Sequence, residues 1–185
     1  MIKKPIFYLF TSLSMISCQI NGNFKGLYSY YETTRKQNPN LFIKNEGNIC
    51  SLPNCQNVYI TNGKQLSNCL KNKEKSLIYI WGPKCTSKIC IPLDIVQKIC
   101  TKKNIKLYIV AEYYDSEMMD KKYNIEYPIF GIDTEYYKTN VTKKYLNSFL
   151  NDLSAEIQVE NRYLYFEEGK FVKSYEDLND FENEM

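Results

Sequence analysis

Two cysteines five residues apart stand where a buried strand is expected to end and a helix to begin. The segment reads Trp81-Gly-Pro-Lys-Cys85-Thr-Ser-Lys-Ile-Cys90. A cysteine just ahead of a helix feels the positive end of the helix dipole, which favours the thiolate over the thiol. Lys84 and Lys88 add positive charge close by. Cys85 is therefore the candidate nucleophile, and Cys90 is the candidate thiol that pairs with it.

The composition excludes several other kinds of chemistry. The chain has 185 residues, 7 cysteines and no histidine. Without histidine there is no Ser-His-Asp or Cys-His nucleophile pair and no His-ligated zinc or haem. The 24 Lys and Arg against 21 Asp and Glu give a net charge of +3, and the basic residues are scattered, so no nucleic-acid partner is indicated. Nothing in the sequence indicates a cofactor.

The first residues have the pattern of an export signal. A basic start is followed by an apolar run at residues 5–16, which is shorter than the ~20 residues needed to span a bilayer but fits the core of a secretory signal. The run ends in Ser17-Cys18. This order resembles the lipobox of bacterial lipoproteins, in which the cysteine is acylated and becomes the new N-terminus. An ordinary signal peptide with an incidental cysteine is the alternative.

These features divide the chain into four parts. Residues 1–17 are expected to be a lipoprotein signal peptide, residues 18–57 a tether and irregular extension, residues 58–175 the folded domain, and residues 176–185 a solvated acidic tail. Lipoproteins that are exported to the cell surface tend to carry an acidic cluster after the acylated cysteine. This chain has none there, so we expect a cell-envelope protein anchored through Cys18 that faces the periplasm.

Unbroken apolar runs mark two central strands. Residues 76–81 (SLIYIW) and 106–112 (KLYIVAE) are typical of strands buried on both faces. Between them, residues 87–103 carry two apolar stripes at helical spacing, which predicts a long, largely buried helix with a kink at Pro92. Further strands are expected at 58–61, 127–132, 162–166 and 171–175, and further helices at 65–71, 116–123 and 141–153. This order predicts an α/β fold with a mixed central sheet and helices on both faces.

The strand, the cysteine and the helix together resemble the thioredoxin superfamily, and within it the membrane-tethered TlpA/ResA-like branch. The resemblance covers about residues 58–175. It rests on Trp81, Cys85 four residues later, Pro92, the segment Tyr127-Pro-Ile-Phe-Gly-Ile-Asp133, and Gly169-Lys170 in the closing hairpin. It implies a thioredoxin-like fold in which Cys85 is the nucleophilic cysteine.

Three positions depart from the pattern of that family. Lys88 stands where the second cysteine of Cys-x-x-Cys belongs, which makes Cys90 the nearest substitute. Five residues along a helix turn through about 500°, so Cys90 can meet Cys85 only if Cys85 lies outside the regular helix. Glu160-Asn161 occupies the place of the family's cis-proline, and no acidic residue stands between Ile89 and Leu93, where relatives often keep a proton-transfer carboxylate.

The remaining cysteines predict disulfides, because an exported protein folds in an oxidising compartment. Cys50 and Cys55 flank Pro53-Asn54, and a turn there would allow a structural disulfide between them. Cys69 and Cys100, on helices beside the central strand, could pair with each other or remain buried thiols. A Cys₄ zinc site is a further alternative, although the spacing is unusual for one.

Two functions from different classes are consistent with these residues. The first is thiol–disulfide exchange with protein thiols or disulfides, in which Cys85 attacks and Cys90 resolves the mixed disulfide. The second is a redox-inactive binding or structural lipoprotein, in which the disulfides only stabilise the fold. That protein would bind an unknown envelope protein through a groove near Trp81, Pro83 and Asn161.

Overall fold

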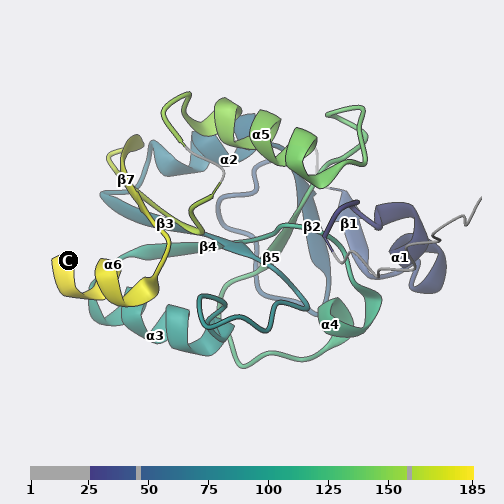
Figure 1. Cartoon of the computed structure of the whole chain (residues 1–185), viewed down its shortest axis with the longest axis horizontal. Coiled ribbons are helices and arrows are strands. Elements are labelled where there is room, and N and C mark those ends of the chain that lie inside the picture. Colours follow the sequence, from purple (N-terminus) through teal and green to yellow (C-terminus); the bar gives the residue numbers. More distant parts are fainter. Residues whose placement is uncertain (1–25, 45–46, 158–159) are drawn as a thin grey trace, which may run out of the picture.

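The computed structural model describes residues 26–44, 47–157 and 160–185, which form a seven-stranded sheet between two layers of helices (Figure 1). The strands lie in the order β1-β2-β5-β4-β3-β6-β7. The first five are parallel, and β6 pairs antiparallel with both β3 and β7. Their bounds are β1 (Phe42–Lys44), β2 (Val58–Thr61), β3 (Lys75–Trp81), β4 (Lys106–Ala111), β5 (Ile129–Ile132), β6 (Tyr163–Glu167) and β7 (Lys170–Tyr175). The predicted mixed α/β architecture is confirmed, whereas the signal segment and Cys18 lie outside the described residues.

The two apolar runs form neighbouring strands at the centre of the sheet. β3 and β4 pair in parallel from Ser76 with Lys106 to Trp81 with Ala111. Side chains alternate across a strand, so Leu77 and Tyr79 join the core on one face while Ile78 joins the core on the other. Both faces are covered, which explains why the sequence here is continuously apolar instead of alternating.

Helices cover both faces of the sheet (Figure 1). The helices α2 (Gly63–Leu70) and α5 (Thr142–Leu153) pack on one face, and α3 (Leu93–Lys102), α4 (Ser116–Asp120) and α6 (Leu178–Glu184) pack on the other. α2 starts with a capping box between Asn62 and Gln65, and a side chain at Gly63 would collide with the Phe149 carbonyl of α5. Within the described ranges, no helix is long and apolar enough to cross a membrane.

The segment expected to be an irregular extension contributes to the folded unit. It contains α1 (Tyr31–Gln37) and β1, which extends the sheet by pairing in parallel with β2. Tyr31 and Leu41 are buried, and the Tyr31 ring packs against Phe42 and Tyr114. The folded part of the chain therefore begins well before residue 58.

The acidic C-terminal segment also differs from the sequence prediction. It forms α6, which begins with the Asp177 side chain accepting a hydrogen bond from the Asn179 N–H. Leu178 and Phe181 are buried, and the Phe181 ring packs against the rings of Tyr165 and Tyr175. The prediction of a solvated tail is wrong, because one side of this acidic helix is apolar and covers the sheet.

Candidate functional site

The loop of residues 82–92 brings the two predicted site cysteines together at the edge of the sheet where the parallel strands end. Cys85 and Cys90 form a disulfide with their Cα atoms 5.9 Å apart. Both are partly exposed. Ser87 lies between them, with its Oγ 3.3 Å from the Cys85 Sγ and 3.5 Å from the Cys90 Sγ. An incoming thiol can therefore approach this disulfide from solvent.

The helix after the loop starts later than the sequence pattern predicted. α3 begins at Leu93, with Pro92 as its N-cap. The prediction of a helix from residue 87 with a kink at Pro92 is wrong, because proline lacks an N–H and fits the start of a helix without a kink. Cys85 and Cys90 instead lie in turns, which close by hydrogen bonds from Cys85 N to the Gly82 carbonyl and from Cys90 N to the Ser87 carbonyl. Cys85 thus lies outside the regular helix, as pairing with Cys90 requires, and the helix begins eight residues after it in the sequence.

Tyrosine hydroxyls hold both ends of the disulfide loop. The Tyr113 hydroxyl accepts a hydrogen bond of 3.0 Å from the backbone N–H of Lys84. At the other end, Tyr79 donates to the Ile91 carbonyl at 3.0 Å, and Tyr163 donates to the Ile89 carbonyl at 2.9 Å. The last two tyrosines come from the paired strands β3 and β6, and their rings stack with centroids 4.8 Å apart. The loop backbone is therefore fixed to the rigid centre of the sheet.

These tyrosines act as neutral hydrogen-bonding groups. Burial raises the pKa of Tyr79 and of Tyr163, and it also raises the pKa of Tyr113 although the hydrogen bond from the Lys84 N–H opposes it. Each hydroxyl keeps its proton at neutral pH. The contacts that hold the loop therefore do not change with pH in the physiological range.

The charge near Cys85 differs from the sequence expectation. The Lys84 ammonium does not point at the disulfide as a free cation, because it forms ion pairs with Asp115 at 2.9 Å and with Glu117 at 3.2 Å. Hydrogen bonds to these two carboxylates raise the pKa of Lys84. The positive charge of Lys84 is largely neutralised, so it contributes little to stabilising a thiolate.

A second ion pair, which sequence reasoning missed, lies beside Cys85. The Arg162 Nη2 is 3.1 Å from the Glu112 Oε2, and both side chains are largely shielded from solvent. A β-carbon added at Gly82 would lie 3.1 Å from the Cys85 Cβ and 3.5 Å from both Arg162 Nη1 and Glu112 Oε2. The signal was present in the sequence, since Glu112 follows one central strand and Arg162 precedes the strand that pairs antiparallel with β3. Both positions belong to the edge that carries Cys85.

The other disulfide joins Cys50 to Cys69, with Cα atoms 5.0 Å apart. The predicted pairing of Cys50 with Cys55 is therefore wrong, as is the possible pairing of Cys69 with Cys100. Cys69 is fully buried on α2, and the bond ties the irregular segment after β1 to that helix. Its place in the core of the α2 and α5 face indicates a structural role.

Cys55 and Cys100 are free thiols in contrasting surroundings. Cys100 is buried in α3, and burial raises the pKa of its thiol to about 12. Cys55 is partly exposed and lies 3.2 Å from the Tyr59 hydroxyl. It lines a pocket of about 160 Å³ together with Lys122 and Tyr123. Neither thiol has a second cysteine bonded to it, so neither forms part of a redox pair in this structure.

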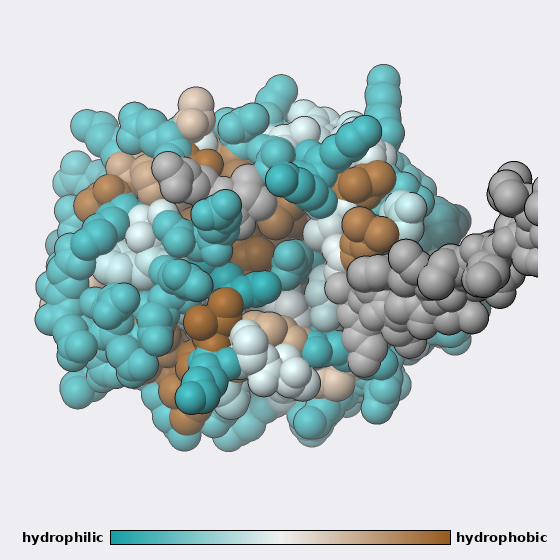
Figure 2. Space-filling view, viewed as in Figure 1, coloured by the Kyte–Doolittle hydropathy of each residue, from teal (hydrophilic) through white to brown (hydrophobic). Residues whose placement is uncertain are grey.

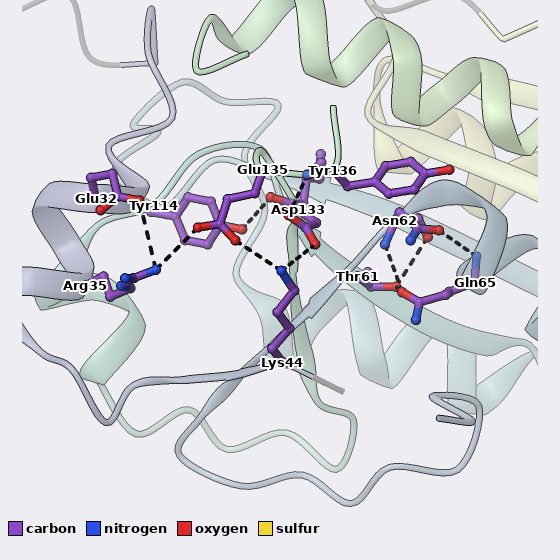
Figure 3. Close-up of polar contacts among 11 residues, drawn as sticks. Glu32, Arg35, Lys44, Thr61, Asn62, Gln65, Tyr114, Asp133, Glu135 and Tyr136 are labelled. Atoms are coloured by element: carbon purple, nitrogen blue, oxygen red, sulfur yellow. Dashed lines mark hydrogen bonds and ion pairs between the residues drawn. The ribbon is translucent and has the colours of Figure 1, made fainter. Parts of the chain in front are cut away.

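A charged network lies at the same edge of the sheet but farther along, where β1, β2 and β5 end (Figure 3). Glu135 accepts hydrogen bonds from Lys44 at 3.0 Å and from Arg35 at 3.4 Å, and Lys44 also lies 3.6 Å from Asp133. The carboxylates and cations compensate one another. The network therefore serves to hold α1 and β1 against the rest of the sheet.

Apolar side chains near the site include Tyr30, which is 37% exposed and packs against Tyr113. Figure 2 shows small, separate hydrophobic patches on a mostly hydrophilic face. Trp81 and Pro83 are buried, and the Trp81 ring packs against Tyr123, so neither lines a binding groove. Among the residues that the structure describes, no group of three or more Cys, Asp or Glu side chains is placed to hold a metal ion.

Comparison of the chain with protein-family models, with curated proteins and with solved structures finds no match. The functional argument therefore depends on the geometry of the disulfide loop and the groups around it.

Proposed function

We propose that this protein is an extracytoplasmic, lipid-anchored thioredoxin-like protein that carries out thiol–disulfide exchange through Cys85, with Cys90 as the resolving thiol. The observation that carries the proposal is the Cys85–Cys90 disulfide, which is accessible yet held on a backbone fixed by tyrosines of the central sheet. A catalyst needs both properties, because its sulfur atoms must be reached by a partner and must return to one geometry in each cycle.

The order of elements supports the thioredoxin-like part of the proposal. From β2 onward the chain runs through alternating strands and helices to an antiparallel hairpin, the order that the sequence patterns predict for the region of the resemblance. Cys85 follows the central strand β3, and Pro92 begins the next helix. This placement supports the role of nucleophilic cysteine that the resemblance implies for Cys85.

The exchange reaction is balanced by a dithiol or disulfide partner. In the reduced protein, the Cys85 thiolate attacks a partner disulfide, forms a mixed disulfide and releases one partner thiolate. The Cys90 thiolate then attacks the Cys85 sulfur, which releases the second partner thiolate. The protein ends with the Cys85–Cys90 disulfide, and the partner has gained two electrons. A dithiol protein of the envelope restores the reduced form by the reverse steps.

A redox-inactive binding or structural lipoprotein is the second candidate, and two observations favour it. The Lys84 charge is neutralised by Asp115 and Glu117, and the helix begins only at Leu93. Two devices that commonly activate a cysteine are therefore weak here. In this case the Cys85–Cys90 disulfide would stabilise the loop without taking part in thiol–disulfide exchange.

The proposed location follows from the sequence of the first eighteen residues. Acylation of Cys18 would anchor the protein to a membrane, with the folded part in the periplasm. We expect cells fed a clickable fatty acid to label the protein, and a Cys18→Ser variant to lose the label. A labelled Cys18→Ser variant would exclude this anchor.

The test of the exchange function uses the full chain purified from membranes in detergent. Redox buffers of known potential are followed by alkylation and peptide mapping. A Cys85–Cys90 disulfide that opens between about −120 and −270 mV supports exchange, and one that resists reduction below about −300 mV supports the structural role. Cys85→Ser should abolish disulfide reductase activity, and Cys55→Ser, which removes a free thiol elsewhere, should not. Activity that survives Cys85→Ser excludes the proposed function.

A further inference from the structure

The ion pair between Arg162 and Glu112 is held in place more firmly than a surface ion pair. The Arg162 Nη1 donates a hydrogen bond of 3.0 Å to the Ile80 carbonyl, while its Nη2 contacts Glu112. The Arg162 backbone carbonyl also accepts a hydrogen bond of 2.8 Å from the Ile80 N–H. The side chains of Arg162 and Glu112 are only 19% and 22% exposed. The guanidinium is therefore a fixed charge at the end of the central strand.

The pair lies near Cys85, on the same side of the Gly82 backbone. A single methyl group at Gly82 would touch the Cys85 Cβ, a guanidinium nitrogen of Arg162 and a carboxylate oxygen of Glu112. These three groups thus converge on one side of the Gly82 backbone. Because residue 82 is a glycine, it places no side chain of its own between the cysteine and the two charges.

The other charged and titratable groups near the loop are poor candidates for this role. Lys84 is paired with two carboxylates, and Lys88 is fully at the surface. Tyr113 faces the loop from the end of β4 and is neutral, because burial raises its pKa. The dipole of α3 starts beyond Pro92. Arg162 and Glu112 are therefore the two charges that the fold holds against Cys85 in a shielded position.

We propose that Arg162 and Glu112 tune the acidity of the Cys85 thiol in opposite directions, Arg162 by stabilising the thiolate and Glu112 by opposing it. The proposal rests on the proposed exchange function, in which Cys85 is the attacking group. When two electrons and one proton convert the Cys85–Cys90 bond into a Cys85 thiolate and a Cys90 thiol, a new negative charge appears near the guanidinium. Arg162 then interacts with a carboxylate on one side and with a thiolate on the other. Both residues are positioning residues, because they influence the Cys85 sulfur only by electrostatic interaction with its negative charge.

The experiment measures the pKa of Cys85 in the reduced full chain, from the rate of alkylation of the Cys85 peptide at a series of pH values. Arg162→Gln should raise that pKa by about one unit, because it removes the cation and leaves Glu112 uncompensated. Glu112→Gln should lower the pKa of Cys85 by about one unit, because the Arg162 charge is then no longer compensated by a carboxylate. The double variant Arg162→Gln/Glu112→Gln should return close to the wild-type value.

The matched controls are Arg35→Gln and Glu135→Gln, which break an arginine–carboxylate pair at the other end of the same sheet edge. They should leave the pKa of Cys85 unchanged. Arg162→Lys, which keeps the positive charge, should restore most of the effect lost in Arg162→Gln. If Arg162→Gln does not fold, Glu112→Gln still tests the proposal, because its predicted shift has the opposite sign and the arginine remains.

The outcomes separate the inference from the function on which it rests. Opposite shifts in the two single variants support the inference even if no exchange activity is found, in which case the proposed function fails alone. Shifts of the same sign, or no shift in either variant, overturn the inference even if exchange activity is present. A Cys85 thiol that does not react at any pH before unfolding overturns both.

Discussion

The Cys50–Cys69 disulfide should stabilise the fold more than the Cys85–Cys90 disulfide does. Its cysteines are separated by 19 positions in the sequence, against 5 for the other bond. In the chain-entropy view a cross-link stabilises by restricting the unfolded chain, and the effect grows with the length of the closed loop. These separations correspond to about 3 kcal/mol for Cys50–Cys69 and about 2 kcal/mol for Cys85–Cys90.

Two double variants isolate these contributions. A Cys85→Ala/Cys90→Ala chain retains only the Cys50–Cys69 bond, and a Cys50→Ala/Cys69→Ala chain retains only the other. Urea unfolding, followed by far-ultraviolet circular dichroism with and without reductant, gives the free energy that each bond contributes. Comparing oxidised and reduced forms of the same chain keeps the packing volume nearly constant, which matters because Cys69 is fully buried.

Two results would refute the reasoning. One is a loss of less than about 1 kcal/mol when the Cys50–Cys69 bond alone is reduced, since the loop it closes should restrict the unfolded chain by more than that. The other is a peptide map of the oxidised protein in which Cys50 is joined to Cys55. In that case the bond would close a much shorter loop, and the segment after β1 would not be tied to α2.

Three further predictions concern the core, the free thiols and the loop. Phe181→Ala should lower the free energy of unfolding by about 3 kcal/mol in urea, because the ring is fully buried. An alkylating reagent at pH 8.5 should modify the partly exposed Cys55 in the native protein, and should reach Cys100 only after unfolding. Burial raises the pKa of Cys100 from 9.0 to about 12, so the stability linked to its neutral form is complete below pH 9 and is lost as the pH rises toward 12. Tyr163→Phe leaves the Ile89 carbonyl without its donor and should cost about 1 kcal/mol, and protease nicking within the loop should become faster than in wild type.

Much of the fold could be predicted from patterns within the sequence. The continuous apolar runs identified β3 and β4 as central strands, because only a strand covered on both faces needs no polar side. The closing hairpin expected around Gly169-Lys170 is formed by β6 and β7, and the turn residues Glu168 and Gly169 have positive φ angles. The order of strands and helices from β2 onward follows the prediction because each element has its own local period.

The errors arose where a residue's role depends on its neighbours in space. Pro92 was placed inside a kinked helix because apolar residues at helical spacing lie on both sides of it, although proline is favoured at the start of a helix. The partner of Cys50 could not be derived, because Cys69 reaches it only once α2 has packed on the sheet. In the tail, the acidic composition concealed the helical spacing of Leu178 and Phe181, which was the signal for a packed helix. Lys84 was read as a free cation because Asp115 and Glu117 lie far from it along the chain.

The same limit applies to the candidate site. The two cysteines could be predicted from the sequence, because thiol–disulfide exchange requires cysteines and their spacing is visible along the chain. The Arg162–Glu112 pair was not found, because its members belong to different strands and meet only through the sheet order. One of only two arginines in a lysine-rich chain, at the start of a strand beside β3, was the available sign.

The start of the described chain lies against the tyrosine that holds the disulfide loop. A β-carbon at Gly26 would be 3.4 Å from the Tyr113 ring, and Tyr113 in turn holds the Lys84 N–H. Under the proposed anchoring, Gly26 is eight positions after Cys18, a reach of at most about 29 Å when fully extended. This short tether would then keep the folded part close to the bilayer, so that partners react with the disulfide at the membrane surface and not in the open periplasm. Inserting a long Gly/Ser spacer after Cys18 should widen the range of partners trapped by a Cys90→Ser variant. An unchanged set of partners would show that the short tether does not select partners.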